Sequence, residues 1–515
     1  MKKAAGLRAG MGSSFLPTMG AFLALPMLVA CQVKEHRSQL QELEAQSDLP
    51  TYDPAAGKGP RTPIAIPSPA VSPNPAVSPA PSPGPSGPPN SVAVSATVLQ
   101  TLPDDFLGVN IVAFWGGYSF TAKAGTALAA AGFKHFRFPG GVPATFYDWS
   151  QTSGNCNNWS APSPSDMWNF AAPLGASMMF QTNPTAQGQC NNDYSGAHAA
   201  GWVRDSASKG MRVPYWEIGN EPEMESTFQN NLDLYATRFN DQAAAIHVAD
   251  PVAQVYGPST TNINFWGNVD GFLAKTGNKQ GTGSVDGVSL HFYPFGGDYP
   301  MGSAGAGWLD YFPGAIAGIK ASINKYDSRN LPIAITETSG NSAQMSDAIQ
   351  GLELLGQYTR YGVSHVEWFC SSQANQWGIL PGDNPSPAYY GLVLWSKVGT
   401  VVLDLNQGSN YKYQVSSYAF RKASGAHQVL MLNKTAQTQA MTVQFSGVNL
   451  TGKSVAIYSL KPGNAGNVSS PTVSYNGAIN PDPASLPGPA SDTSAGATYT
   501  YALPAYNAVL LEFAP

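Results

Sequence analysis

The chain has 515 residues, which is enough for two or three domains and for a large buried core. Only 11% of the residues are charged and 11% are aromatic, and there are 53 glycines and 42 prolines, a composition more typical of an exported, loop-rich protein than of a cytosolic one. The formal net charge of −5 argues against nucleic acid as a partner.

An export signal is predicted at the start of the chain. Residues 1–30 carry three basic side chains and no acidic one, and they end in the apolar run Phe22–Ala30, which is too short to span a bilayer comfortably. The segment LVAC, which closes at Cys31, resembles the bacterial lipobox, in which the cysteine is acylated and the preceding peptide is removed. We therefore expect a lipoprotein signal peptide over residues 1–30 and an exported bacterial protein, periplasmic or on the cell surface, with Cys31 as its membrane anchor. An ordinary signal peptide with an incidental cysteine is the alternative.

Residues 31–90 are predicted to form a lipid-anchored linker. The stretch 32–48 is polar and has too few apolar positions to pack alone, and residues 60–90 contain 12 of the 42 prolines. In a polyproline II conformation, at about 3.1 Å per residue, the second stretch would hold a folded domain several nanometres from the membrane.

Three cysteines follow the linker. Cys156 and Cys190 lie in Asn-rich, loop-like sequence, where an oxidising compartment favours a disulfide bond. Cys370 follows a predicted buried strand and is expected to be a free core thiol. The sequence contains neither a CxxC motif nor a His-rich spacing, so we expect no metal and no cofactor.

Residues 101–394 alternate short apolar runs with longer helix-like segments. Runs such as IAITE and GVSLHFY are too uniformly apolar for a sheet with one buried face, as expected for parallel strands covered on both sides. Eight such units predict an α/β fold, a (β/α)8 TIM barrel; a doubly wound open sheet is the alternative, but no Gly-rich phosphate loop supports it. The predicted strands are 107–112, 135–141, 177–183, 215–220, 254–258, 287–293, 333–337 and 365–370. The clearest predicted helices are 122–131, 232–248 and 346–361.

Residues 395–515 show a different pattern. Helical periodicity gives way to alternating stretches such as HQVLMLNK and MTVQFSG, which predict antiparallel strands of a C-terminal β-sandwich with one buried face. The stretch 91–100 has the same character and precedes the first barrel strand. We expect it to pair into the sandwich, which makes the second domain discontinuous.

Two carboxylates mark the predicted active site. Active sites of such barrels lie at the carboxyl ends of the strands. Glu221 follows the fourth predicted strand, in YWEIGNEPE, and Glu337 ends the seventh, in IAITETSG. A pair of carboxyl groups facing one cavity is what glycoside cleavage requires: one protonates the leaving oxygen and the other attacks or activates water.

The paired motifs resemble those of the clan A retaining glycoside hydrolases. NEP at strand four and a glutamate at strand seven stand 116 positions apart, and FRFPGG at strand two resembles families 51, 39, 44 and 79, which also pair the barrel with a β-sandwich. The resemblance covers residues 91–515. It implies that Glu221 is the acid/base and Glu337 the nucleophile. Val142 follows the two glycines where arabinofuranosidases often have asparagine, so the sugar specificity stays open.

Five further strand-end residues are assigned to substrate binding. Asn220 is placed to bind a sugar 2-hydroxyl, Tyr293 and Arg137 to keep Glu337 ionised, His291 to bond the sugar or Glu221, and Trp368 to offer a flat face beneath the sugar ring. Three of them have a purely structural alternative: an ion pair in the core for Arg137, and ordinary barrel packing for His291 and Trp368.

A retaining mechanism predicts carboxyl groups about 5–5.5 Å apart, and an inverting one about 6.5–9.5 Å. We expect a retaining hydrolase of polysaccharide or oligosaccharide substrates, similar to an α-L-arabinofuranosidase, β-xylosidase or β-glucuronidase. The alternative is a non-catalytic carbohydrate-binding surface lipoprotein; a structural cell-wall protein would leave the strand-end carboxylates unexplained.

Overall fold

The computed structural model describes most of the chain beyond residue 89. The described residues are 90–114, 116–151, 161–185, 193–229, 231–261, 269–278, 284–294, 308–373, 377–407 and 411–515. The predicted signal peptide, Cys31, the linker up to residue 89 and the predicted bond between Cys156 and Cys190 lie outside them. Within the described part of the chain, no helix combines the length and the apolarity needed to cross a membrane.

Eight parallel strands form a closed barrel in chain order, β2 to β9, and β9 pairs back to β2. The barrel strands are β2 (Leu107–Asn110), β3 (His135–Phe138), β4 (Ser177–Thr182), β5 (Tyr215–Ile218), β6 (Gln254–Thr260), β7 (Gly287–His291), β8 (Ile333–Thr338) and β9 (His365–Trp368). The (β/α)8 prediction is confirmed, and each strand overlaps a predicted one. Cys370 is a buried free thiol, as expected.

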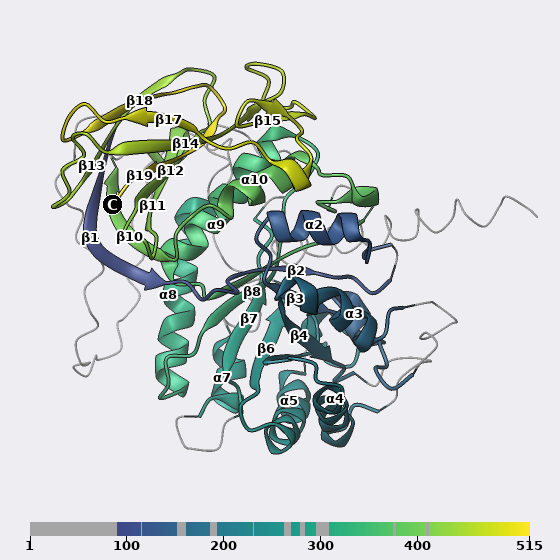
Figure 1. Ribbon diagram of the computed structural model, residues 1–515. Helices are drawn as coiled ribbons and strands as arrows, with labels where there is room; N and C mark the ends of the chain where they lie inside the picture. Colours follow the sequence, from purple (N-terminus) through teal and green to yellow (C-terminus); the bar gives the residue numbers. More distant parts are fainter. Residues whose placement is uncertain are drawn as a thin grey trace, which may run out of the picture. The chain divides into compact units, whose positions relative to one another are not determined.

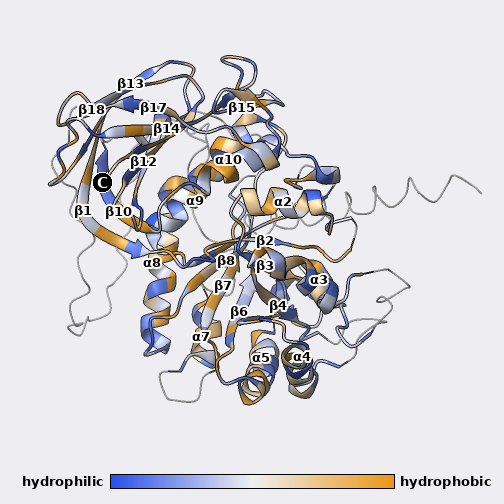
Figure 2. Ribbon diagram, viewed as in Figure 1, coloured by the Kyte–Doolittle hydropathy of each residue, from blue (hydrophilic) through white to orange (hydrophobic). Residues whose placement is uncertain are grey.

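Helices surround the barrel (Figure 1). Their bounds are α2 (Ala122–Ala130), α3 (Pro164–Ala171), α4 (Gly196–Ser208), α5 (Leu232–Ala249), α7 (Asp270–Thr276), α8 (Trp308–Tyr326), α9 (Met345–Tyr361) and α10 (Pro387–Trp395), with short 3-10 turns η1 (Val142–Thr145), η3 (Ala172–Leu174), η4 (Pro222–Met224) and η6 (Pro381–Asp383) between them. Local chemistry sets several helix starts: Ser163 accepts a hydrogen bond from the Asp166 amide and Asp166 accepts one from the Ser163 amide, so α3 begins with a capping box. All nine residues of α10 are buried, and part of the helix is orange, the hydrophobic colour, in Figure 2.

Strand alternation divides polar from apolar side chains. In β3, Phe136 and Phe138 belong to the apolar cluster that joins strands to helices, whereas His135 and Arg137 face the barrel interior, where they meet glutamates. All four residues are fully buried. The outer face of the barrel strands packs against helices. The charged side chains on the inner face are also buried, and they pair with each other because an unpaired buried charge is costly.

The second domain is a mainly antiparallel sheet. Its strands are β1 (Ser91–Thr101), β10 (Val401–Gln407), β11 (Val415–Arg421), β12 (His427–Asn433), β13 (Gln439–Phe445), β14 (Ser454–Pro462), β15 (Val473–Tyr475), β16 (Ala478–Ile479), β17 (Ala490–Thr493), β18 (Tyr499–Leu503) and β19 (Ala508–Phe513), with the short turns α11 (Tyr411–Gln414) and η7 (Pro483–Ser485). The strand that precedes the barrel, β1, pairs antiparallel with β10 and parallel with β13. Phe513 contacts Phe445 and Tyr499, with ring centroids 5.4 and 5.5 Å away, although β19 pairs with neither β13 nor β18. The sheet therefore folds over a shared apolar core, as a sandwich does.

A buried ion pair links α9 of the barrel to the sandwich. Lys434 Nζ lies 2.8 Å from Glu353 Oε2, and the side chains are 1% and 0% exposed. Ser416 and Tyr418 donate further hydrogen bonds to the Glu353 carboxylate. The charge of Glu353 is thus compensated from several directions, which a buried carboxylate requires.

Candidate active site

The two glutamates singled out from the sequence lie together at the carboxyl end of the barrel. Glu337 is the fifth residue of β8, and Glu221 follows β5 with Gly219 and Asn220 between. Only 8% of Glu221 and 5% of Glu337 is exposed. A carboxylate oxygen of Glu221 lies within 4.8 Å of one of Glu337. The fold thus places two nearly buried carboxylates close together.

The backbone turns sharply at Glu221. This residue has φ 44° and ψ 54°, the left-handed conformation, and it caps the 3-10 turn η4. Such a conformation costs an L-residue about 1–2 kcal/mol. The Glu221 amide donates to the Ser259 carbonyl at 2.8 Å, which ties the turn to the end of β6. Backbone strain held by tertiary contacts is common where side chains must be aimed at a functional site.

An irregularity in β8 turns Glu337 toward the barrel interior. Ala334 packs with interior residues and Ile335 with the outer apolar cluster, so regular alternation would send Glu337 outward. Beyond Ile335, however, the pairing of β8 shifts register with both β7 and β9. The extra residue reverses the alternation. Thr338 then faces α9, where its hydroxyl lies 2.8 Å from that of Tyr358, and Glu337 faces inward.

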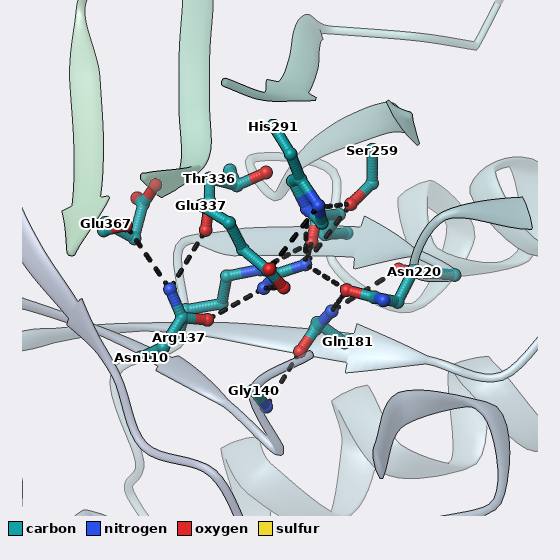
Figure 3. A network of polar contacts seen from close by, with 12 residues as sticks. Asn110, Arg137, Gly140, Gln181, Asn220, Ser259, His291, Thr336, Glu337 and Glu367 are labelled. Carbon is teal, nitrogen blue, oxygen red and sulfur yellow. Dashed lines mark hydrogen bonds and ion pairs between the residues drawn. The ribbon is translucent and has the colours of Figure 1, made fainter. Parts of the chain in front are cut away.

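Arg137 is the centre of the polar network drawn in Figure 3. Its guanidinium donates to Glu217 at 2.7 Å and to Glu337 Oε1 at 2.7 Å, and also to the amide oxygens of Asn110 at 2.7 Å and Asn220 at 2.9 Å. Burial opposes the charge of Arg137, but Glu217 and Glu337 hold its pKa above the usual value. The cation predicted to hold Glu337 therefore also orders the neighbouring amides.

The orientation of Asn220 follows from its partners. Arginine nitrogens only donate, so the atom facing Arg137 is the Asn220 amide oxygen, which also accepts a longer bond of 3.5 Å from Gln181. The other end of Gln181 accepts from the Gly140 amide at 2.8 Å. The NH2 group of Asn220 is thereby the end left to donate to a ligand.

His291 and Tyr293 bridge the carboxylates to the barrel wall. His291 Nδ1 lies 2.8 Å from Glu221 Oε1 and 3.5 Å from Glu337 Oε2, and its Nε2 lies 3.0 Å from Ser259 Oγ. Burial by itself would lower the pKa of His291, but Glu337 and Glu221 together raise it. The Tyr293 hydroxyl donates to Glu337 Oε2 at 2.7 Å, and burial and that carboxylate raise the tyrosine pKa well above its usual value, so the phenol stays a donor.

A third carboxyl group lies behind the pair. Glu223 is 5% exposed, and one of its oxygens accepts a short hydrogen bond from the Thr261 amide. Its second oxygen has no hydrogen-bond partner among the described residues. Burial, and to a lesser degree the charge of Glu221, raise the pKa of Glu223 to about 7. This acid is therefore partly neutral near physiological pH.

The same cluster is poorly suited to a metal ion. Glu221, His291 and Glu337 each offer a ligand atom, all within 4.8 Å of one another. However, the Arg137 guanidinium already lies 2.7 Å from Glu337, and a divalent cation would be repelled by it. The polar network is instead arranged around a cation of the protein itself, the guanidinium group of Arg137.

The structure corrects the expectation for Trp368. The tryptophan is 1% exposed and belongs to the outer apolar cluster, and a Cβ added at Gly351 of α9 would lie 2.9 Å from its ring. Its neighbour Glu367 faces inward, so alternation sends Trp368 outward, away from the glutamates. The aromatic rings at the site are instead those of Tyr293, Phe369 and Trp377, which contact one another with centroids 5.5–6.5 Å apart.

Four residues of the network were not assigned to the site from the sequence. Asn110, Glu217 and Ser259 accept hydrogen bonds from Arg137, and Gln181 donates one to Asn220. Gln181 and Glu217 lie within strands. Assigning every second residue of each strand to the barrel interior would have identified both. Ser259 has φ 56° at an irregularity of β6, which no sequence signal announces.

The fold and the site define a class of protein. Its members have a closed parallel barrel joined to a β-sandwich, with two buried glutamates at the carboxyl ends of the barrel strands. No protein-family model matches the chain, and no curated protein matches it by sequence. Solved structures do match in fold. They include a family 51 α-L-arabinofuranosidase from Thermotoga petrophila (TM-score 0.64, 15% identity), the bifunctional glucanase-xylanase CelM2 from a metagenome library (0.61, 15%) and a Paenibacillus polymyxa xyloglucanase of family 44 (0.59, 14%).

Each of these matches covers 82% of this chain and 99% of the other chain. The alignment thus includes both the barrel and the sandwich of the glycoside hydrolases. At this level of identity the likeness establishes the fold, and the predicted architecture of families 51 and 44 is confirmed.

Proposed function

We propose that the protein is a retaining glycoside hydrolase in which Glu337 is the nucleophile and Glu221 the acid/base. The observation that carries the proposal is the separation of the two carboxylates, which have oxygens within 4.8 Å of each other. That spacing suits direct attack by one carboxylate, for which about 5–5.5 Å is typical, and leaves no room for the water that an inverting enzyme places between its acids.

The reaction proceeds by two displacements. In the first, an oxygen of Glu337 attacks the anomeric carbon, the glycosidic C–O bond breaks, and protonated Glu221 gives its proton to the leaving oxygen. In the second, ionised Glu221 takes a proton from water, which attacks the anomeric carbon and releases Glu337 as a carboxylate. The sugar leaves with its original anomeric configuration.

The surrounding residues support these roles. Arg137 and Tyr293 each donate a hydrogen bond to one oxygen of Glu337, which fixes the orientation of the nucleophile. His291, in contact with Glu221 at 2.8 Å, is placed to exchange a proton with it as the acid/base changes state. The NH2 group of Asn220, whose amide oxygen accepts from Arg137, is placed to bind the sugar hydroxyl next to the reacting carbon.

The substrate is proposed to be a neutral or acidic plant-type or microbial glycan. The fold neighbours carry arabinofuranosidase, glucanase-xylanase and xyloglucanase activity by name, and the sequence adds β-glucuronidase-like enzymes as a further class. Phe369 and Trp377 are partly exposed and lie beside Tyr293, so they are candidates for the stacking surface first assigned to Trp368. A panel of aryl α-L-arabinofuranosides, β-xylosides, β-glucosides and β-glucuronides separates the classes.

The mechanism is tested by removing each carboxylate. Glu337→Ala and Glu221→Ala are expected to lower hydrolysis of the best aryl glycoside by several orders of magnitude. Azide should rescue Glu337→Ala as a glycosyl azide of inverted configuration, and rescue Glu221→Ala as one of retained configuration. Glu512→Gln, a glutamate of the sandwich hydrogen-bonded to Gln428, is the matched control and should keep full activity. Full activity in either alanine variant, or azide products of the opposite configurations, contradicts the assignment. No hydrolysis of any substrate by the unmodified chain, with retained glycan binding, would favour the non-catalytic lipoprotein.

We further propose that the enzyme is exported and held at a membrane by acylated Cys31. The charged and apolar layout of residues 1–30 and the LVAC segment support this proposal. Cys31→Ser should abolish incorporation of labelled fatty acid and release the protein from the membrane fraction. Unchanged lipid labelling in that variant would contradict the anchor.

A further inference from the structure

A second group of histidine and carboxylate side chains lies at the opposite end of the barrel. Asp105 precedes β2, His135 is the first residue of β3, and His365 is the first residue of β9. Because β2 pairs with both β3 and β9, the three residues meet where the first and last barrel strands close the barrel. One potential ligand atom from each lies within 4.8 Å of the other two.

The distances suit a small metal ion with little movement. His365 Nε2 lies 3.5 Å from Asp105 Oδ1, and His135 Nδ1 lies 4.0 Å from Asp105 Oδ2. Nitrogen and carboxylate ligands about 2.0–2.2 Å from a tetrahedral zinc ion are separated from each other by about 3.3–3.5 Å. The gap between these side chains is therefore slightly wider than a filled site and wider than a hydrogen bond.

The outer nitrogen of each imidazole already faces an oxygen. His135 Nε2 lies 3.3 Å from Glu367 Oε1, and both side chains are 0% exposed. His365 Nδ1 lies 3.2 Å from Ser364 Oγ. Histidines that bind metals characteristically direct one ring nitrogen at the ion and the other at a carboxylate, carbonyl or water, which fixes the tautomer. Both histidines have this arrangement toward the space beside Asp105.

Buried atoms without partners give a second, independent indication. Among the described residues, His365 Nε2, His135 Nε2 and both carboxylate oxygens of Glu367 are buried and lack a hydrogen bond of good geometry. Leaving such groups unsatisfied costs about 1–3 kcal/mol each, and more for charged groups. A cation bound by Asp105 and the two imidazoles would give His365 Nε2 a ligand.

Asp105 connects this group to solvent. Its side chain is 18% exposed, whereas that of His135 is fully buried, so an ion can enter from the Asp105 side. The hydroxyls of Tyr215 and Ser177 donate to Asp105 Oδ2 at 3.2 and 2.9 Å, which orients the carboxylate.

We propose that Asp105, His135 and His365 bind one divalent transition-metal ion of the zinc type, with Glu367 as the carboxylate behind His135. Two imidazoles and one carboxylate are a borderline ligand set that selects such ions over magnesium or calcium. The ion clamps the seam between β9, β2 and β3 and has no part in glycoside cleavage. The sequence predicted no metal because these ligands are 30 and 230 positions apart.

Zinc titration of the chelator-treated full-length chain tests the proposal. Isothermal calorimetry should show one site per chain, and zinc should raise the thermal unfolding midpoint, since an ion that binds only the folded state stabilises it. Asp105→Asn and His365→Gln should each weaken binding by at least about 100-fold, and Glu367→Gln by about 10–100-fold. His247→Gln, which removes a partly exposed histidine 2.7 Å from Asp286, is the matched control, and Glu337→Gln controls for the glutamate cluster; both should bind zinc normally.

The visible absorption spectrum of bound cobalt tests the site in the unmodified chain, so the result does not depend on whether the variants fold. The unmodified chain with one equivalent of Co²⁺ should show the intense visible bands of a four- or five-coordinate ion with nitrogen ligands, and zinc should abolish them. No such spectrum, no zinc-induced shift of the unfolding midpoint, or zinc binding that survives both Asp105→Asn and His365→Gln in folded protein would overturn the proposal.

Discussion

Replacing Glu223 by glutamine is expected to change how stability depends on pH. Glu223 is buried behind Glu221, accepts one hydrogen bond from the Thr261 amide, and has a pKa raised to about 7 by burial. Glutamine has nearly the same shape and keeps an oxygen to accept from Thr261, but it does not titrate. The variant thus removes a proton-binding group with little change in packing.

The sign and size follow from the difference between the two states. In the unfolded chain Glu223 should titrate near its ordinary value of 4.5, so between pH 4.5 and 7 the folded protein keeps a proton that the unfolded chain has lost. Stability must then fall as the pH rises through this window, by about 1.4 kcal/mol per pH unit. Across the whole window the loss attributable to Glu223 is about 3 kcal/mol.

Urea unfolding of the wild type and Glu223→Gln at pH 5 and pH 8, followed by tryptophan fluorescence, measures this contribution. The wild type should lose about 2–3 kcal/mol more than the variant between the two pH values, because every other titrating group is shared. Glu512→Gln should behave as the wild type. If wild type and Glu223→Gln show the same pH dependence, Glu223 is not held neutral by burial and the reasoning fails.

Three further outcomes are expected. Lys434→Met leaves Glu353 buried without its cation and should lower the free energy of unfolding by about 3–5 kcal/mol, with partial recovery in the double variant that also carries Glu353→Met, as measured by urea denaturation. Tyr293→Phe removes a 2.7 Å hydrogen bond to the Glu337 carboxylate, of a kind that contributes about 1.5–3 kcal/mol, so kcat/KM on an aryl glycoside should fall about 10- to 150-fold with an unchanged circular dichroism spectrum. Trp368→Phe should lower the thermal midpoint through lost packing on α9 while leaving KM unchanged; a large rise in KM without loss of stability would restore its sugar-binding role.

The fold was predictable because its signals are local. Uniformly apolar runs of strand length, each followed by a helical segment, specify parallel strands covered on both faces, and alternating stretches after residue 394 specify a sheet with one buried face. The grouping of the candidate site residues followed from the same rule, since polar residues at strand ends must meet at one end of a barrel. Glu221, Glu337, Arg137, His291 and Tyr293 were found in this way.

Other features of the site depend on whether a strand residue faces the barrel interior or the helices. Only the tertiary structure decides this. The register shift in β8 turns Glu337 inward, and the uninterrupted alternation of β9 turns Trp368 outward, although both residues end apolar strands. A shift of one residue exchanges the two faces of a strand, and no local sequence signal marks it.

The amino-acid sequence by itself determined the barrel, the sandwich and the pair of glutamates. The tertiary structure decided the polar network around Arg137 and the grouping of Asp105, His135 and His365, because closing the barrel brings β9 beside β2 across more than 250 positions of the chain. Contacts of that kind arise from strand pairing between distant segments, and they become visible only when the register of every strand is known.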